Sequence, residues 1–292
     1  MTDSSSIQRR YLEDLQLAGL SPRTQEAYVR AVRQLEQHLD TSLESITDEQ
    51  LREYFLHVMT VKKWSRPSCT IALCAIRILI ERTLKRDWAA MKFVRPARQE
   101  KLPVILSVQE VRRVLGQVRL ARFRACLCTI YSCGLRLGEG TRLRVADIDS
   151  GRKLIHVRGG KGNKDRYVPL PQSTLQILRK FWRTHRDPVW VFPGPEQGGV
   201  KRPAASKPLH PSGVQDALRK SLVASGLHKK VGVHTLRHSW ATHLLEANVN
   251  LRLIQIWLGH SSPSTTALYT HLTTSSTQAA TKIIDALMDG LE

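Results

Sequence analysis

His234-Thr-Leu-Arg237-His238-Ser-Trp-Ala-Thr-His-Leu-Leu245 is the stretch that says most about this fold. Within it, leucines and a tryptophan recur at helical spacing and form an apolar face. His234 and Arg237 lie three residues apart, so both side chains fall near one other face, close to the helix N-terminus. The free N–H groups and the positive dipole end at that terminus attract phosphate. Arg237 is therefore predicted to lie off the core and to be free to point at a ligand.

Three further pieces lie apart from this helix in the sequence. Leu258-Gly259-His260 ends a predicted helix, with glycine at the C-terminal capping position. Tyr269 follows on the next predicted helix. Arg136 lies far upstream, just past a helix end, and Glu139 one turn later could orient Arg136 or a neighbouring basic side chain. Each piece alone fits an ordinary structural role, but two arginines, two histidines and a tyrosine together suit phosphodiester chemistry without a metal.

The charge of the chain predicts an anionic partner. The 292 residues carry a formal net charge of +20, and the pI is about 10.3. Residues 1–53 carry 6 basic and 10 acidic side chains, whereas residues 54–292 carry 39 basic and 15 acidic ones. Nucleic acid is the usual partner of such a charge. A membrane surface is the competing anion, but no basic helix with an aromatic face favours it.

Cysteine usage and hydropathy indicate a cytoplasmic protein. The five cysteines are odd in number, and no two pairs have the spacing of a zinc site. They are predicted to be reduced thiols in or near the core. The sequence suggests no signal peptide and no apolar run of membrane-spanning length. Because no carboxylate cluster stands out either, we expect no metal and no cofactor.

Helical periodicity divides the chain into two domains. Residues 1–92 are predicted to form a unit of four helices, with Ser21 capping the helix that begins at Pro22 and a capping box at Thr47-Asp-Glu-Gln50. Residues 93–104 contain two prolines and three basic residues, which predicts an extended linker. Residues 105–292 form the second domain. Its helices are predicted from Ser107 to about Leu115, near 119–134, 171–185, 211–225, 235–247, 250–258 and 263–272, and in a tail from about 275.

A β-hairpin interrupts the helices of the second domain. Residues 152–158 and 166–170 have the pattern of strands, and they flank the turn-rich stretch 159–165. Lys161 lies at the tip between two glycines, which would let the backbone approach a DNA strand closely. Lys164 is an alternative for any role assigned to a lysine here, and a solvated turn is the plain structural alternative.

Taken together, these pieces resemble the tyrosine recombinases, the family of lambda integrase and the Xer proteins. The resemblance rests on Gly134-Leu-Arg136-Leu-Gly-Glu139, Gly160-Lys161-Gly-Asn-Lys-Asp-Arg166, the His234–Leu245 stretch, Leu258-Gly-His260 and Thr265-Thr-Ala-Leu-Tyr269. Residues 19–39 are similar to the start of the family's core-binding domain. Gly138 and Gly140 depart from the family pattern and are expected to loosen the helix start after Arg136.

The resemblance implies the fold and the reaction. The expected fold is mainly α with a small β-sheet, in which a helical core-binding domain and a catalytic domain form a C-shaped clamp on DNA. The expected function is site-specific DNA recombination or integration, in which strands are cut and rejoined through a 3′-phosphotyrosine without a metal. Tyr269 would be the nucleophile. Arg136 and Arg237 would bind the non-bridging phosphate oxygens.

The resemblance also implies roles for the remaining site residues. Lys161 would protonate the leaving 5′-oxygen, and His234 would act as acid or base. His260 would donate a hydrogen bond to the phosphate, and Glu139 would support the arginines. The basic candidates for DNA contact are Arg66, Lys85, Arg86, Arg95, Arg98, Lys101, Arg142, Arg144 and Lys164.

The expected partners are double-stranded DNA and further protomers, which assemble as a tetramer on two DNA sites, with a related recombinase as a possible second subunit. An apolar stripe in the tail, at Ala280, Ile283, Ile284, Leu287 and Leu291, would dock on a neighbouring protomer.

The gene is expected to be bacterial or carried by a mobile element. A type IB topoisomerase-like enzyme, a non-catalytic DNA-binding regulator and a metal-dependent nuclease are the alternatives. The target sequence and the direction of the reaction stay open.

Overall fold

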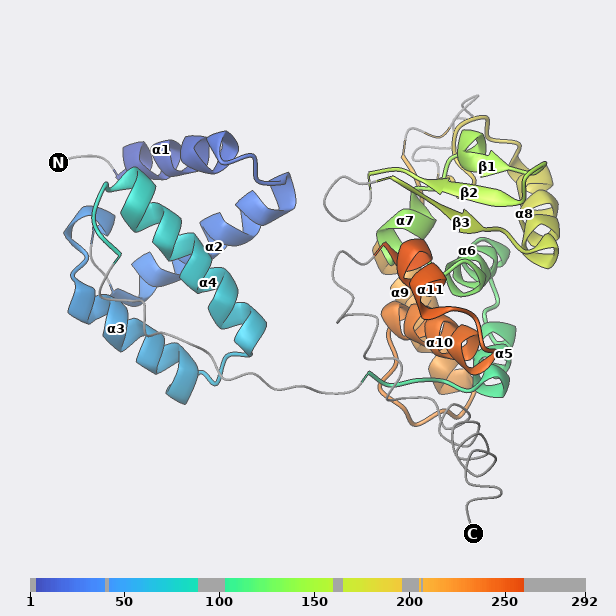
Figure 1. Cartoon of the computed structure of the whole chain (residues 1–292). Coiled ribbons are helices and arrows are strands. Elements are labelled where there is room, and N and C mark those ends of the chain that lie inside the picture. The colour runs from blue at the N-terminus through green and yellow to red at the C-terminus, as the bar shows by residue number, and fades with distance from the viewer. Residues whose placement is uncertain are drawn as a thin grey trace, which may run out of the picture. The chain divides into compact units, whose positions relative to one another are not determined.

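The computed structural model describes residues 4–39, 42–88, 103–159, 165–195, 205 and 207–259. The chain divides into two compact units, Met1–Lys101 and Leu102–Glu292. The fold is mainly helical with one small antiparallel sheet (Figure 1), as the sequence predicts.

The first unit contains the four predicted helices. They are α1 (Ser4–Leu17), α2 (Pro22–Leu39), α3 (Asp48–Leu56) and α4 (Arg66–Ile78), with a 3-10 turn at Leu43–Ser45. The last turns of α3 and α4 widen into π-helical segments, His57–Val61 and Leu79–Thr83.

Local sequence signals account for two of these helix starts. The predicted capping box is present, since the Thr47 hydroxyl accepts from the Gln50 N–H at 3.2 Å and the Gln50 Oε1 accepts from the Thr47 N–H at 2.9 Å. The Ser21 hydroxyl accepts from the Thr24 N–H at 3.3 Å, next to Pro22 in the first turn of α2. The buried hydroxyl of Tyr11 on α1 donates to the Ala75 carbonyl of α4 at 2.9 Å, which ties the first helix to the last.

The second unit is built from seven helices among its described residues. They are α5 (Val108–Gly116), α6 (Ala121–Ser132), α7 (Leu137–Thr141), α8 (Gln172–His185), α9 (Pro211–Ala224), α10 (Val233–Glu246) and α11 (Leu251–Leu258). α10 packs against α6 and α11, and α11 lies against β3 of the sheet (Figure 1). The predicted helices in this part of the chain are confirmed, whereas those near 263–272 and from about 275 lie outside the described residues.

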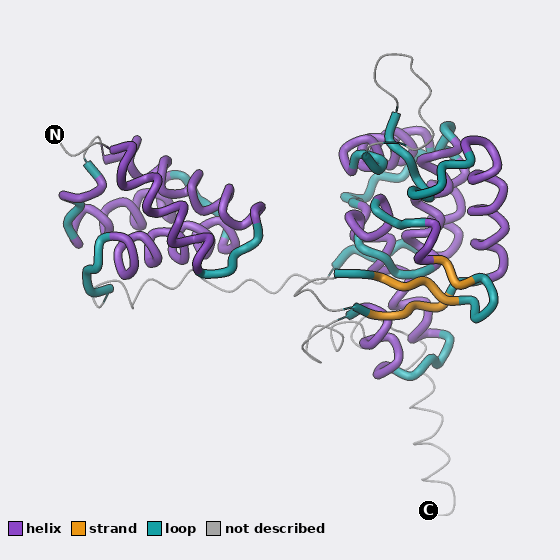
Figure 2. The backbone as a smooth tube through the Cα atoms, turned by 90° about the horizontal axis from the view of Figure 1, so that it is seen from above, coloured by secondary structure: helices purple, strands orange, loops and turns teal. Residues whose placement is uncertain are grey.

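The sheet has three strands in the order β1-β2-β3. They are β1 (Ile148–Asp149), β2 (Leu154–Val157) and β3 (Arg166–Pro169), all antiparallel. They lie at one end of the unit in Figure 1 and are drawn in orange in Figure 2. The predicted hairpin is confirmed as β2 and β3, although both strands are shorter than expected. β1 was not predicted, because two residues are too few to show a period of two.

The cysteines are free thiols in or near the core, as their number and spacing predict. Cys69, Cys126 and Cys133 are buried, Cys74 and Cys128 are half-buried, and all five are free thiols. Burial raises the pKa of Cys133 to about 12, so this thiol stays protonated.

In the described part of the chain, no helix has the length and apolar character needed to cross a membrane.

Gly140 is tightly packed, which corrects the expectation of a loose helix start. A Cβ at Gly140 would lie 2.5 Å from Ile130 Cγ1 and 2.9 Å from Ile130 Cδ1, because α7 lies directly on α6. A Cβ at Gly138 would meet only the flexible guanidinium of Arg142, at 3.3 Å. Gly140 therefore allows the close approach of two helices, while Gly138 has room beside it.

We expect Gly140→Ala to lower the free energy of unfolding by about 1–3 kcal/mol, because the added methyl group must displace Ile130. Gly138→Ala is the matched control. It should be neutral or stabilising by up to about 1 kcal/mol, since alanine is the better helix former. Urea unfolding followed by circular dichroism compares the two variants. Equal effects would show that α6 and α7 have space for a side chain at both positions.

Candidate active site

Arg136 and Glu139 are joined across the first turn of α7. The Glu139 carboxylate accepts from the Arg136 backbone N–H at 2.7 Å and from Arg136 Nη1 at 2.8 Å. Only 7% of the Glu139 side chain is exposed, against 22% for Arg136. Glu139 therefore fixes both the backbone and the side chain of the first predicted phosphate-binding arginine.

Glu139 holds a second arginine, Arg166, at the start of β3. Arg166 Nη1 and Nη2 donate to the two carboxylate oxygens at 2.9 and 2.7 Å, and both side chains are 7% exposed. This parallel, two-bond geometry is the strongest form of an arginine–carboxylate pair. Arg166 was not among the predicted site residues. The alternation of the strand could have identified it. Arg166 shares the inner face of β3 with the buried Val168, and a buried arginine needs a carboxylate partner.

Arg237 is buried, which corrects the prediction that it lies off the core. Its side chain is 4% exposed and lies 3.8 Å from the Glu139 carboxylate. Nη1 donates to the Gly134 carbonyl at 2.6 Å, and Nη2 donates to the Leu258 carbonyl. Arg237 therefore joins Arg136 and Arg166 around one carboxylate, and we call these three arginines and Glu139 the arginine cluster.

Gly134 brings the end of α6 close enough to α10 for this contact. Its φ of +59° lies in the left-handed region, and a Cβ there would lie 2.4 Å from the Trp240 ring. Only glycine meets both conditions without strain. The tight corner presents the Gly134 carbonyl to Arg237 and starts the segment that carries Arg136.

The cluster also caps the C-terminal end of α11. Arg166 Nε donates to the Trp257 carbonyl at 2.6 Å, Arg237 Nη2 donates to that of Leu258, and Arg136 Nη2 donates to that of Gly259 at 3.2 Å. The last carbonyls of a helix lack partners within it. Three consecutive carbonyls of this end thus each receive an arginine, immediately before residue 260.

Electrostatics keep Glu139 ionised. Burial alone would raise its pKa, but the hydrogen bonds and charge of Arg166, with the bonds from Arg136, lower the pKa to about 2. Three guanidinium groups around one carboxylate leave the cluster with a net charge of about +2. Such a site attracts and stabilises an anion.

His234 lies in the first turn of α10, as predicted, and its side chain is partly open to solvent. Partial burial of the ring and the charges of Arg237 and Arg136 lower its pKa, and Glu139 opposes them. Partial burial, with His234 and Arg237 nearby, lowers the pKa of His238 to about 4. Both rings are therefore neutral at neutral pH, and His234 can accept a proton.

The structure brings together only part of the predicted set. Arg136, Glu139, His234 and Arg237 come from α7, α10 and the residue before α7, and they lie around one site. The remaining predicted catalytic residues lie outside the described residues. These are Lys161, His260 and Tyr269.

The described candidates for DNA contact differ in how they are held. Arg66, Lys85, Arg142 and Arg144 are exposed. Arg86 is half-buried, and it donates to the Ile46 carbonyl at 2.5 Å and lies 3.6 Å from Asp48. That engagement favours a structural role for Arg86 over the predicted DNA contact. Arg95, Arg98, Lys101 and Lys164 lie outside the described residues.

Comparison with known proteins identifies the family. Residues 105–276 match the phage integrase family, and residues 7–90 match the phage integrase N-terminal SAM-like domain. The putative integrase/recombinase y4qK of Sinorhizobium fredii is 38% identical over 96% of this chain and 89% of its own length. The tyrosine recombinase XerA of Thermococcus onnurineus is 33% identical over 98% of each chain.

A solved structure supports the fold independently. A lambda integrase tetramer bound to a Holliday junction superposes with a TM-score of 0.72 at 18% identity, covering 91% of this chain and 76% of that one. The chain therefore belongs to the phage integrase family of tyrosine recombinases, which are site-specific recombinases that act as DNA strand transferases.

Proposed function

We propose that this recombinase cuts and rejoins DNA by transferring a phosphodiester to Tyr269, within the arginine cluster. The observation that carries the proposal is the convergence of Arg136 and Arg237 on one site with net positive charge. Their planar groups match the geometry of a phosphate and stabilise the charge that develops on its oxygens during transfer.

The other tyrosines of the second unit are poor alternatives for the nucleophile. The Tyr131 hydroxyl lies 2.9 Å from His243 Nδ1, and burial raises its pKa. Tyr167 is exposed and stacks on His156, with ring centroids 4.7 Å apart. Tyr131 is paired with His243, and Tyr167 lies on the face of β3 opposite to Arg166, which supports the assignment of Tyr269 from its place in the family motif.

The proposed reaction balances without a cofactor. The Tyr269 oxygen bonds to phosphorus and loses its proton to a base, for which His234 is suited because its ring is neutral. The bond from phosphorus to the 5′-oxygen breaks, and Lys161 supplies the proton to that oxygen. His260 would donate a hydrogen bond to the phosphate. A 5′-hydroxyl then reverses the steps, so the phosphotyrosine bond conserves the energy of the phosphodiester.

The test is formation of a covalent adduct in EDTA. The protein is incubated with a randomised duplex library that carries single nicks, so that cleavage near a nick releases a short 5′-hydroxyl strand and traps the enzyme on the DNA. Adducts that survive denaturation are isolated and sequenced, which also gives the preferred site. Binding without adduct would favour a regulator, and strand cutting that depends on a divalent metal would favour a nuclease. Relaxation of supercoils without exchange between duplexes would favour a topoisomerase.

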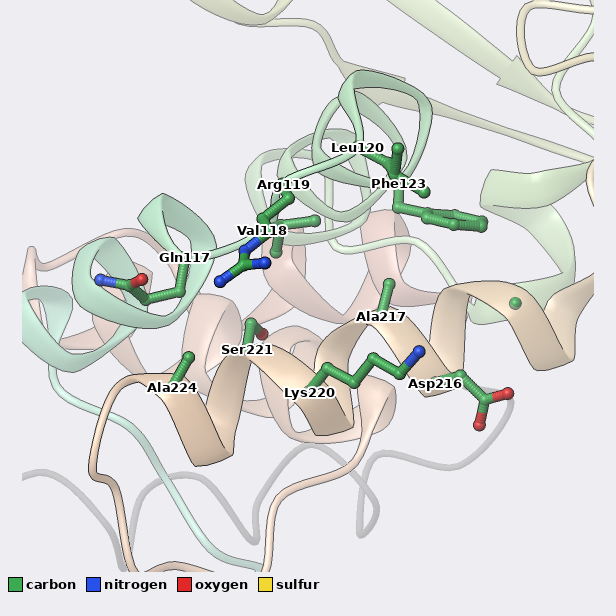
Figure 3. A pocket seen from close by; sticks show the side chains of 11 residues that line it. Gln117, Val118, Arg119, Leu120, Phe123, Asp216, Ala217, Lys220, Ser221 and Ala224 are labelled. Carbon is green, nitrogen blue, oxygen red and sulfur yellow. The ribbon is translucent and has the colours of Figure 1, made fainter.

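We further propose that protomers assemble as a tetramer on two duplexes, as in the lambda integrase structure. A groove between the α5–α6 connection and α9 is a candidate acceptor for the tail of a neighbouring protomer (Figure 3). It is lined by Val118, Leu120, Phe123 and Ala217 together with Arg119 and Lys220.

The composition of the tail suits this groove. Residues 278–292 carry the apolar stripe, one lysine and three acidic residues. Deleting them should spare binding to a single site and impair tetramer formation, measured by analytical ultracentrifugation with the trapped DNA site. Tetramers that form unchanged would reject this role of the tail.

A further inference from the structure

Three arginine side chains bind the C-terminal end of α11. Its terminal carbonyls, at Trp257, Leu258 and Gly259, accept from Arg166, Arg237 and Arg136 in that order. Residue 260 follows immediately, and Tyr269 lies ten residues beyond Gly259. The position of the chain that enters the His260–Tyr269 segment is thus set by side chains of the arginine cluster.

Arg166 makes contacts that differ from those of the other two arginines. Its guanidinium is bound on both sides, by the Glu139 carboxylate and by the Trp257 carbonyl, and its side chain is 7% exposed. Its aliphatic stem packs on Gly259, where a Cβ would lie 3.0 Å from Arg166 Cδ. Gly259 has a φ of +62°, so the turn that ends α11 is formed directly against Arg166.

Arg166 also sets the charge that Glu139 presents to the site. Both carboxylate oxygens accept from Arg166, while Arg136 Nη1 binds only one of them. Without Arg166, Glu139 would be left with Arg136 and with Arg237 at 3.8 Å, and the net charge of the cluster would fall from about +2 to about +1.

We propose that Arg166 is a positioning residue for strand cleavage, which holds the end of α11, and so the start of the His260–Tyr269 segment, in register with Arg136 and Arg237. The inference rests on the proposed function, because it concerns the same transfer of phosphate to Tyr269. Arg166 itself is directed at Glu139 and Trp257, so its effect on the reaction passes through these neighbours.

The test separates DNA binding from cleavage in Arg166→Gln and Arg166→Lys. The probe is a nicked duplex with the site recovered from wild-type adducts, with affinity measured by fluorescence anisotropy and cleavage by single-turnover adduct formation. We expect both variants to bind within about threefold of wild type. Cleavage should fall on the order of 100-fold in Arg166→Gln and 10-fold in Arg166→Lys, since a small displacement of reacting groups has effects of this size. Lysine keeps the charge but cannot bind Glu139 and Trp257 together.

Arg158→Gln is the matched control. Arg158 follows β2 in the same sheet and pairs with the buried carboxylate of Asp147 at 2.6 Å, but it makes no contact with the cluster. We expect Arg158→Gln to cleave at the wild-type rate. This result would show that removing one positive charge from the sheet does not by itself slow cleavage.

Three results would overturn the proposal. One is cleavage by Arg166→Lys at the wild-type rate, and another is a parallel loss of binding and cleavage in both variants. The third is loss of the folded state in Arg166→Lys, since Arg166 would then be needed for folding and not for register. Failure of the proposed function is distinguished from all three, because the wild-type protein would then form no adduct.

Discussion

Tyr269→Phe is expected to form no covalent adduct with the nicked duplex, while its affinity for that duplex stays within about twofold of wild type. The change removes one oxygen atom, and without it no bond to phosphorus can form at this position. Cleavage should fall by at least about 10⁴-fold, which is the scale at which removal of a nucleophile acts in other covalent enzymes. Adduct formation is measured on denaturing gels and binding by fluorescence anisotropy.

Tyr167→Phe and Tyr131→Phe are the matched controls, since each removes a phenol oxygen from the same unit. Tyr167 is 52% exposed and Tyr131 contacts His243, away from the cluster, so both variants should retain adduct formation. If Tyr269→Phe still forms adduct and one of the controls loses it, the nucleophile is assigned to the wrong tyrosine. Loss of adduct and binding together in Tyr269→Phe would instead point to a structural role for this tyrosine.

The helices and the hairpin were predictable because their signals are local. Apolar spacing, the capping box at Thr47 and the glycines at 134 and 259 each act within a few residues, and the structure has the predicted elements at these places. The family motif also predicts that Arg136, Glu139, His234 and Arg237 lie in one site. These residues lie in separate segments, so their convergence came from the resemblance and not from periodicity.

The arrangement inside the site was not predictable in the same way. The apolar face of α10 suggested that Arg237 points outward, yet the carbonyls of Gly134 and Leu258 and the nearby Glu139 allow its burial. All three partners are distant in sequence, and two of them are backbone atoms, which carry no sequence signal. The packing of Gly140 on Ile130 was missed for the same reason, because the distance between α6 and α7 is a property of the folded domain.

Glu139→Ala is expected to lower the free energy of unfolding by about 3–5 kcal/mol, the range seen when one partner of a buried ion pair is removed. Arg166 and Arg237, which are 7% and 4% exposed, would be left buried without their shared carboxylate. Asp147→Ala is the control, because Asp147 is equally buried but its partner Arg158 is 54% exposed and stays hydrated. Its loss should be smaller, and equal losses in urea unfolding would show that Glu139 does not organise the cluster.

The dependence of stability on pH gives an independent measure of the same carboxylate. The pKa of Glu139 falls from an ordinary value of 4.5 to about 2 in the folded protein. Because the unfolded chain takes up the proton first, this stabilisation is complete above about pH 4.5 and is lost as pH falls toward 2. It amounts to about 3 kcal/mol. Glu139→Gln has no such group, so the difference in unfolding free energy between wild type and variant should shrink by about that amount over this range. A difference that stays constant with pH would mean that the Glu139 pKa is the same in both states, and that the three arginines do not depend on its charge.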